Sequence, residues 1–333
     1  MGTNSAIEWC DHSWNPWQGC TKVSPGCKNC YMYRQMKQYG RDATVVRRSA
    51  DATFNLPLRA NDWKAGDKVF VCSWSDFSHP AADEWRSDSW DIMRTRNDVT
   101  YQILTKRPER LAQCLPPDWG DGWDNVWLGV SAENQEMLDL RWPLLKRIPA
   151  KVRFLSIEPM LGAVSLSGIF GLKPGNQWRD CLCDEIDPSD RPCLVCDGRR
   201  LLGESSGLHW VIAGGESGPN ARPMHPDWAR GARDECAVAQ VPFFFKQWGE
   251  WAPLPIRLPD PKIYSATHGH GNRGYNMAIA ALSKEFNASA IVAAHPGGSI
   301  GAITFDVDLL GRVGKHRAGA FLDGREHKEF PHA

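Results

Sequence analysis

Six apolar runs recur along the chain, and each ends abruptly in a cluster of polar residues. The runs are 67–72, 101–104, 126–130, 152–155, 209–213 and 241–245. Continuous rather than alternating apolar runs of this length are typical of parallel strands buried on both faces. Segments 83–95, 134–148 and 226–238 lie between the runs and carry apolar residues at helical spacing. The pattern therefore predicts strands that alternate with helices.

This alternation predicts an α/β protein built on a parallel, partial TIM-type barrel with right-handed crossovers. Ile7-Glu8-Trp9 is predicted to be its first strand. In such folds the active site forms at the C-terminal ends of the strands, so the polar clusters are expected to meet there. The predicted core spans 1–164 and 209–252. A Cys-rich insert, 165–208, interrupts it, and a C-terminal extension, 253–333, is expected to pack on the barrel.

The C-terminal extension has a weaker pattern than the core. Residues 276–286 are predicted to be helical, and residues 288–294 and 301–307 are predicted to be strands. Basic residues gather in 312–317 and 325–328. They either line a substrate channel or form an ordinary solvated face.

Three cysteines share one short loop after the first predicted strand. Cys20, Cys27 and Cys30 form a C-x6-C-x2-C pattern, and residues 24–26 between the first two, Ser-Pro-Gly, favour a tight turn. A structural zinc or a ferredoxin-type cluster normally takes four protein ligands. Three thiolates on one loop therefore indicate a cubic iron–sulfur cluster whose fourth iron stays open to an outside ligand.

Cys10 is the rival fourth ligand, because it lies at the end of the first predicted strand. As a ligand it would close the cluster and leave an electron-transfer or structural role. It can also be a hydrogen-atom donor or a packed thiol. The other scattered cysteines, Cys72, Cys114 and Cys236, are interpreted as small buried hydrophobic residues.

A second cysteine cluster lies in the insert. Cys181, Cys183, Cys193 and Cys196 form a C-x-C-x9-C-x2-C pattern. Four thiolates on two close-set knuckles suit tetrahedral zinc, and a stretch this poor in apolar residues would need the metal to fold. An auxiliary iron–sulfur cluster is the alternative, because spacing does not separate the two.

Composition narrows the function classes. Lys plus Arg equals Asp plus Glu, 39 each, which excludes bulk polycation binding to nucleic acid but leaves room for a local basic groove. No stretch reaches the length of an apolar membrane span, and the N-terminus lacks a signal pattern, so we expect a cytoplasmic protein without a membrane partner. The 16 tryptophans pack in the core or stack on nucleobases or an adenine.

Candidate site residues come from the predicted strand ends. They are Ser73, Trp74, Ser75, Asp76, Lys106, Arg107, Ser131, Glu133, Glu158, Gly214, Gly215 and Glu216. The open alternative for Lys106 and Arg107 is solvated surface charge. For Glu158 and Glu216 it is a helix N-terminal cap or a structural ion pair.

With these residues in hand, the chain resembles a phage-associated three-cysteine-motif family that is similar to radical S-adenosylmethionine enzymes. The matching segments are 7–9, 14–16, 19–27, 30–31, 104–108, 128–131, 214–218, 246–249, 312–315 and 322–325. The resemblance spans most of the chain and is weakest at 165–208 and 253–308. The chain departs from the wider radical enzyme pattern in its six-residue first gap and in Asn29, where an aromatic residue is common. The Gly-Gly-Glu triplet also follows a late strand rather than the second.

The resemblance implies a 4Fe–4S cluster on the three loop cysteines and S-adenosylmethionine chelated to the open iron. One electron would cleave the sulfonium to methionine and a 5′-deoxyadenosyl radical, which abstracts hydrogen from an unactivated C–H bond. Residues 73–76, Ser131, Glu133 and 214–216 are the cofactor-binding candidates. The catalytic candidates are Cys10, Lys106 and Glu158.

Two classes of function follow. The leading hypothesis is a radical enzyme that modifies or rearranges a nucleobase or nucleotide, as in phage DNA modification in the host cytoplasm, with an electron donor such as a flavodoxin. The reaction could be an isomerisation, a lyase step or a C–C bond formation. A peptide or small-molecule substrate is the alternative within this class. The second class is a non-catalytic, metal-stabilised nucleic-acid-binding module.

Overall fold

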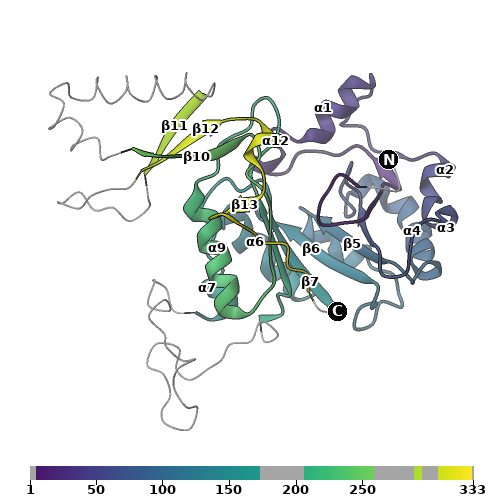
Figure 1. Cartoon of the computed structure of the whole chain (residues 1–333). Helices are drawn as coiled ribbons and strands as arrows, with labels where there is room; N and C mark the ends of the chain where they lie inside the picture. The colour runs from purple at the N-terminus through teal and green to yellow at the C-terminus, as the bar shows by residue number, and fades with distance from the viewer. Residues whose placement is uncertain (1–4, 173–205, 259–288, 295–306, 332–333) are drawn as a thin grey trace, which may run out of the picture.

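The centre of the molecule is a seven-stranded, all-parallel sheet that curls strongly into a half-barrel (Figure 1). The computed structural model describes residues 5–172, 206–258, 289–294 and 307–331. The strand order is β1 (His12–Trp14), β4 (Lys68–Val71), β5 (Thr100–Thr105), β6 (Val126–Ser131), β7 (Val152–Ile157), β8 (Trp210–Gly214) and β9 (Phe243–Gln247). The predicted partial TIM-type barrel is therefore confirmed, and each of the six apolar runs overlaps one of the strands from β4 to β9.

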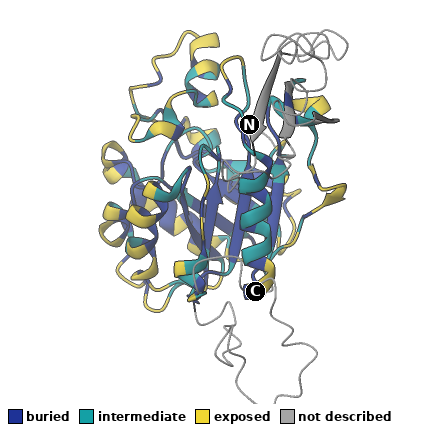
Figure 2. Ribbon diagram, turned by 90° about the vertical axis from the view of Figure 1, so that its left-hand side faces the viewer, coloured by how far each residue is buried: buried dark blue, intermediate teal, exposed yellow. Residues whose placement is uncertain are grey.

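Three long helices cover the outer, convex face of the sheet (Figure 2). They are α4 (Asp83–Thr95), α6 (Gln135–Lys146) and α9 (Pro226–Ala239), which agree with the three predicted helical segments. The α6 helix begins where the Asn134 side chain accepts a hydrogen bond from the Met137 amide. No helix among the described residues is long and apolar enough to cross a membrane.

The remaining described elements are short. They are β2 (Trp17–Gln18), η1 (Pro25–Cys27), α1 (Tyr31–Gln38), β3 (Arg47–Arg48), α2 (Asp51–Phe54), α3 (Leu56–Arg59), η2 (Pro80–Ala82), η3 (Pro108–Arg110), α5 (Leu111–Cys114), α7 (Ser167–Phe170), β10 (Trp251–Leu258), β11 (Ser289–Ala294), β12 (Val307–Arg312), α12 (Lys315–Ala318), β13 (Phe321–Leu322) and β14 (Arg325–Glu326). The strands β10, β12 and β11 form a separate antiparallel sheet. The predicted strand at 288–294 is confirmed as β11.

Both faces of the curled sheet are buried, which explains why its strands lack polar alternation. On β6, Val126, Leu128 and Val130 join the large core under the helices, whereas Trp127 faces the interior of the half-barrel. That interior is filled largely by aromatic side chains. Its buried aromatic residues are Trp9, Phe70, Trp127, Phe154, Trp210 and Phe244.

The predicted first strand at Ile7-Glu8-Trp9 is wrong, because the first strand is β1, five residues after Ile7. Ile7 and Trp9 are apolar for another reason. The Trp9 side chain is 2% exposed and its ring centroid lies 4.5 Å from that of Phe70 inside the half-barrel. A short segment that packs inside the barrel and a short buried strand give the same apolar pattern in a sequence.

The end of the chain closes the same interior. The Phe330 ring lies 5.1 Å from the Trp210 ring, and the Trp210 indole donates to the Glu329 carbonyl oxygen over 2.8 Å. Lys328 forms an ion pair with Glu8. The last described residues thus pack against both the β9 side of the half-barrel and the N-terminal segment, so the open edge of the sheet does not face solvent there.

Several predictions fall outside the described residues. They concern the second cysteine cluster, Cys181, Cys183, Cys193 and Cys196, the helix at 276–286 and most of the strand at 301–307. The strand β12 begins at Val307, where that predicted strand ends.

Close approach of a ring explains the glycine in the middle of β6. A Cβ atom added to Gly129 would lie 2.5 Å from the Phe154 ring. We therefore expect Gly129→Ala to lower the free energy of unfolding by about 1–3 kcal/mol, as overpacked cores do. Chemical denaturation of the purified protein measures this. The matched control is Gly231→Ala in α9, where a Cβ meets nothing within 4 Å. This control should be neutral or stabilising by up to about 1 kcal/mol, and equal losses in both variants would contradict the explanation.

Candidate functional site

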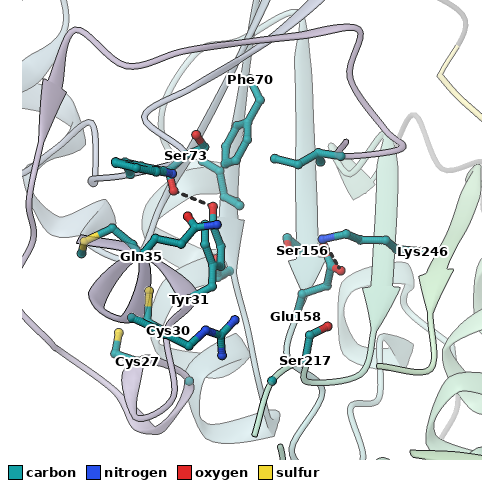
Figure 3. A pocket seen from close by; sticks show the side chains of 18 of the residues that line it. Cys27, Cys30, Tyr31, Gln35, Phe70, Ser73, Ser156, Glu158, Ser217 and Lys246 are labelled. Carbon is teal, nitrogen blue, oxygen red and sulfur yellow. Dashed lines mark hydrogen bonds and ion pairs between the residues drawn. The ribbon is translucent and has the colours of Figure 1, made fainter. Parts of the chain in front are cut away.

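A cavity of about 1030 Å³ opens at the C-terminal ends of the barrel strands. Residues in or shortly after each of the seven strands line it, together with the cysteine loop, α1 and residues 313–317 near the C-terminus. Figure 3 shows Cys27 and Cys30 on one side of this cavity and Glu158 and Lys246 on the other. Polar groups from distant parts of the chain therefore converge at the end of the barrel where parallel folds place their active sites.

The cysteine loop, residues 20–30, forms one wall of the cavity. Cys20, Cys27 and Cys30 are free, partly buried and line the cavity. The loop turns through η1, and Cys30 is the residue at which α1 begins. Burial, followed by the electrostatic influence of all three cysteines, raises the pKa of Tyr33 to about 12, and the Tyr33 hydroxyl donates to the Cys20 carbonyl oxygen over 2.5 Å.

The three cysteines of the loop do not converge on one point. Within the described residues, no three His, Cys, Asp or Glu side chains lie close enough together to hold one metal ion. A cubic cluster instead distributes its thiolate ligands over separate iron atoms. Three cysteines that line one cavity without converging on one point are therefore suited to the corners of a cluster.

Asp76 and Arg107 support the loop from the ends of β4 and β5. Arg107 pairs with Asp76 over 3.1 Å and donates to the Thr21 carbonyl oxygen over 2.8 Å and to the Cys20 sulfur over 3.6 Å. Asp76 also accepts from the Thr105 hydroxyl over 2.6 Å. The predicted cofactor ligand Asp76 thus lines the cavity, but its oxygens are engaged within the protein.

The Cys20 thiol experiences opposing influences. Burial, and then the Asp76 charge, raise its pKa to about 11, although the Arg107 guanidinium opposes both. A cation in contact with sulfur favours the thiolate, which is the form that binds metal. The predicted solvated-charge alternative for Arg107 is wrong, since its side chain is 6% exposed.

Glu133 holds the loop from the end of β6. Its carboxylate is fully buried, accepts from the Gly26 amide over 2.9 Å and pairs with Arg141 over 2.9 Å. Burial opposes ionisation of Glu133, but Lys106, Ser24 and Arg141 outweigh it, so the pKa lies below its usual value. Glu133 was predicted to bind the cofactor, but it does not line the cavity; it positions the cysteine loop.

Glu216 holds the loop from the end of β8. It pairs with Arg222 over 2.6 Å and accepts from the Asn29 side chain over 3.0 Å. Arg222 in turn donates to the Pro25 carbonyl oxygen over 3.1 Å. Asn29 therefore ties the cysteine loop to the barrel.

The two glycines before Glu216 are explained by packing. A Cβ atom at Gly215 would lie 1.9 Å from the Trp248 carbonyl oxygen, and one at Gly214 would lie 2.7 Å from a Glu158 carboxylate oxygen. Neither glycine lines the cavity, although both were predicted to bind the cofactor. They allow β8 and β9 to approach closely beside it.

The segment after β4 does line the cavity, as predicted for Ser73, Trp74 and Ser75. Asn15, which is 1% exposed, donates to the Ser73 hydroxyl over 2.9 Å and accepts from the Trp74 amide over 2.7 Å. Ser75 donates to the Gly19 carbonyl oxygen over 2.5 Å. The buried asparagine was not predicted as a site residue, although its Trp-Asn-Pro motif was visible in the sequence.

Lys106, Ser131 and Glu158 line the cavity, as expected from their places after the strands. The Lys106 ammonium donates to the Ser131 hydroxyl over 2.9 Å. Lys246 pairs with Glu158 over 3.2 Å, and Figure 3 shows this pair with Ser156 beside it. The arrangement offers both a carboxylate and ammonium groups to a bound molecule.

Cys10 lies outside the cavity lining among the described residues. Its thiol donates to the Ser5 hydroxyl over 3.3 Å, and it packs with Trp9 and Phe70 in the aromatic interior. Burial raises its pKa to about 11. Of the alternatives for this residue, the structure favours a packed thiol.

Sequence reasoning missed several lining residues, including Tyr31, Gln35 and Lys246. Tyr31 is 38% exposed and its hydroxyl donates to the Ser73 carbonyl oxygen over 2.5 Å. A signal was available for the first two, because positions i and i+4 of a helix share one face. Lys246 belongs to a motif noted in the sequence, but its role depends on contact with Glu158.

The Glu133–Arg141 pair should dominate the stability of the loop. We expect Glu133→Gln to lower the free energy of unfolding of the metal-free protein by about 3–5 kcal/mol, because it leaves Arg141 buried without its counter-ion. Chemical denaturation at neutral pH measures this. Since the pKa of Glu133 is lowered in the folded state, its stabilisation is present above the unfolded pKa and is lost as pH falls through the folded pKa. The difference between variant and wild type should therefore shrink in acid.

The matched control for this prediction is an exposed pair. Asp51→Asn removes the partner of Arg48, with side chains 77% and 32% exposed, and should change stability by no more than about 0.5 kcal/mol. An equally small effect of Glu133→Gln would show that the cysteine loop is held by other contacts.

A search of curated proteins and a search of solved structures each gave no match. The family model described as a protein of unknown function, DUF5131, matches residues 4–331, which includes the half-barrel, the cysteine loop and the residues that line the cavity. The parallel half-barrel is compatible with the fold of radical S-adenosylmethionine enzymes. The chain belongs to the DUF5131 family.

Proposed function

We propose that this protein is a radical S-adenosylmethionine enzyme whose 4Fe–4S cluster is held by Cys20, Cys27 and Cys30. The observation that carries the proposal is the position of these three cysteines. They share one loop and face one cavity at the C-terminal ends of a parallel half-barrel. Three thiolates leave one iron open for an outside ligand.

One further cysteine, Cys72, lines the same cavity and must be considered as a closing ligand. It is 2% exposed, and burial, then the Asp76 charge, keep its pKa well above the usual value. It lies directly after β4 rather than on the cysteine loop, and it belongs to the large buried core under the helices. We therefore assign Cys72 to packing.

The cavity has room for a cofactor and a second molecule. Its volume of about 1030 Å³ lies at the upper end of the range of about 300–1,000 Å³ that is usual for small-molecule sites. The aromatic interior of the half-barrel lies below it and excludes water from that side. A reactive species formed in the cavity would be shielded on this face.

When bound, the cluster supplies the electron that cleaves the sulfonium of S-adenosylmethionine and initiates hydrogen-atom abstraction from an unactivated C–H bond. This chain's residues bind and orient. We assign Glu158 to the amino group of the methionine moiety, and Lys106 to its carboxylate. The hydroxyls of Ser73, Ser131 and Ser156 remain within the cavity lining for further polar contacts. Arg107 favours the thiolate form of the cluster ligand Cys20.

The substrate that we propose is a nucleobase or nucleotide, consistent with an aromatic ring, Tyr31, that is exposed to the cavity and suited to stacking on a base. A modification, rearrangement, lyase step or C–C bond formation on phage DNA or its precursors fits this class. The electron would come from a donor such as a flavodoxin. A peptide or small-molecule substrate and a non-catalytic nucleic-acid-binding module are the competing functions that the next experiment addresses.

The cysteine ligands can be tested by anaerobic reconstitution with iron and sulfide. We expect Cys20→Ala, Cys27→Ala and Cys30→Ala each to lose the cluster and all formation of 5′-deoxyadenosine from S-adenosylmethionine with dithionite. Iron and sulfide analysis and product chromatography measure the two effects. Cys10→Ala and Cys72→Ala are matched controls that should keep both.

Electron paramagnetic resonance of the reduced protein tests the open iron. The wild-type signal should shift when S-adenosylmethionine is added, and the Cys10→Ala and Cys72→Ala signals should shift in the same way. A wild-type signal indifferent to S-adenosylmethionine, with cluster loss in either control, would identify a closed four-cysteine site. The radical mechanism would then fail, and an electron-transfer or binding role would replace it.

The second cysteine cluster lies outside the described residues, and we propose that it holds zinc. Metal analysis should find about one zinc per chain, the stoichiometry of a single four-cysteine site. Cys193→Ser should lose that zinc, because three thiolates bind it less tightly. A variant that keeps its full zinc content and folds normally, or wild-type protein with extra iron in place of zinc, would contradict this assignment.

A further inference from the structure

The side chains that line the cavity carry an excess of positive charge, and this excess lies at the outer rim of the cavity. The lining cations are Arg34, Lys106, Arg107, Lys246, Lys315 and Arg317, and the lining carboxylates are Asp76, Glu158 and Glu250. Asp76 is paired with Arg107, and Glu158 is paired with Lys246. The deeper carboxylates are therefore neutralised, whereas most of the remaining charge is positive.

The side chains of three of these cations form no ion pair or hydrogen bond with any described residue. They are Arg34 on α1, and Lys315 and Arg317 on α12, and all three are exposed. Figure 1 shows α1 and α12 at the same upper side of the half-barrel. The whole chain carries a formal net charge of zero, so the three cations at this rim are a local feature rather than an effect of composition.

Contacts around Gly218 and Glu250 bring the two cation-bearing segments, α1 and α12, together. The Arg34 guanidinium lies so close to Gly218 that a Cβ atom there would be 2.1 Å from it. Arg312 donates to the Gly218 carbonyl oxygen over 3.2 Å, and the Gly314 amide donates to the Glu250 carbonyl oxygen over 3.1 Å. The rim is thus built around Gly218, whose φ of +110° also favours glycine.

The carboxylate at this rim is already engaged. Glu250 accepts from the Gly218 amide over 2.9 Å, and no ion pair joins it to Arg34, Lys315 or Arg317 among the described residues. An anion that enters the cavity would therefore meet three cations whose side chains are free to turn toward it. Arginine and lysine side chains are the usual protein ligands of phosphate.

A second, independent observation indicates which part of a ligand would lie deeper in the cavity than the rim. Gln35 lines the cavity beside Tyr31 (Figure 3), and its side-chain carbonyl oxygen is buried without a hydrogen-bond partner among the described residues. A buried acceptor without a donor is unfavourable, so a turn of this amide toward the cavity would let an N–H group of a ligand satisfy it. Side-chain amides recognise base edges in this way, and Tyr31 offers a ring for stacking.

We propose that Arg34, Lys315 and Arg317 bind the phosphate group of the substrate, while Gln35 and Tyr31 contact its base. This inference rests on the proposed function and narrows its substrate to a phosphorylated nucleoside. The phosphate belongs either to a free nucleotide or to a nucleic acid strand, since both present the same ester to the rim.

Binding measurements on the full-length protein test the proposal. Calorimetric titration compares the four deoxynucleoside 5′-monophosphates with the corresponding nucleosides, without S-adenosylmethionine or reductant, before and after cluster reconstitution. We expect at least one monophosphate to bind about tenfold or more tightly than its nucleoside, as charge-assisted hydrogen bonds to phosphate would give. Nucleosides that all bind as tightly as their monophosphates would overturn the proposal.

The rim itself is tested with a double variant. Lys315→Ala with Arg317→Ala should weaken monophosphate binding about tenfold or more and leave nucleoside binding unchanged. Arg34→Gln is a second variant and should act in the same direction. The matched control is Lys146→Ala with Arg147→Ala, which removes the same two exposed residue types where α6 ends, away from the cavity. Equal affinity in the rim variants and wild type would overturn the assignment.

A short single-stranded oligonucleotide distinguishes the two sources of phosphate. If a strand is the ligand, it should bind more tightly than any monophosphate, and the slope of log affinity against log salt should fall by about 0.7 for each cation removed. A free nucleotide would instead give monophosphate binding at least as tight as that of the strand. Because these titrations need no S-adenosylmethionine cleavage, failure of the radical chemistry and failure of phosphate binding are separate results.

Discussion

The candidate site depends on three carboxylates that are buried around one short loop. Asp76, Glu133 and Glu216 follow different strands, and each pairs with an arginine. Ion pairs this deeply buried contribute little net stability, because desolvation of both partners offsets their attraction. These ion pairs instead fix the position of the cysteine loop. A displaced loop would leave buried carboxylates and guanidinium groups without hydrogen-bond partners.

The half-barrel makes this arrangement possible by closing one end and leaving the other open. Aromatic rings fill its interior, and Trp9 and Phe330 pack there from the two ends of the chain. The polar strand ends are thereby left as the lining of the cavity. Polar side chains can then lie beside the cysteines, and the cavity meets the aromatic interior at Trp9 and Phe70.

The cavity is divided by the kind of charge that each region carries. The carboxylates that hold the cysteine wall are neutralised by arginines, and the opposite wall carries the Glu158–Lys246 pair. The rim presents cations whose side chains have no partners among the described residues. A molecule with a cationic sulfonium and a zwitterionic end suits the inner regions, and an anionic group suits the rim. The proposed cofactor and substrate would therefore occupy different parts of one space.

Local patterns were sufficient to predict the strands from β4 to β9, the three long helices and the cysteine loop. Burial on both faces, helical spacing and thiol spacing are properties of short segments, so they are visible in the sequence. The same logic placed Ser73, Lys106 and Glu158 after strands, where the structure has them in the cavity lining.

Tertiary contacts decided which way each polar side chain turns. Glu133 and Gly26 are separated by 107 residues, so no local pattern distinguishes a carboxylate that faces a cofactor from one that holds the cysteine loop. Gly214 and Gly215 likewise follow from the close approach of another strand. Trp9 packs inside the half-barrel and does not belong to a strand. Apolar residues at positions 7 and 9 have the same appearance in the sequence in either case. The direction in which a side chain points, and its partners far along the chain, depend on how the sheet curls. Only the folded chain determines that curl.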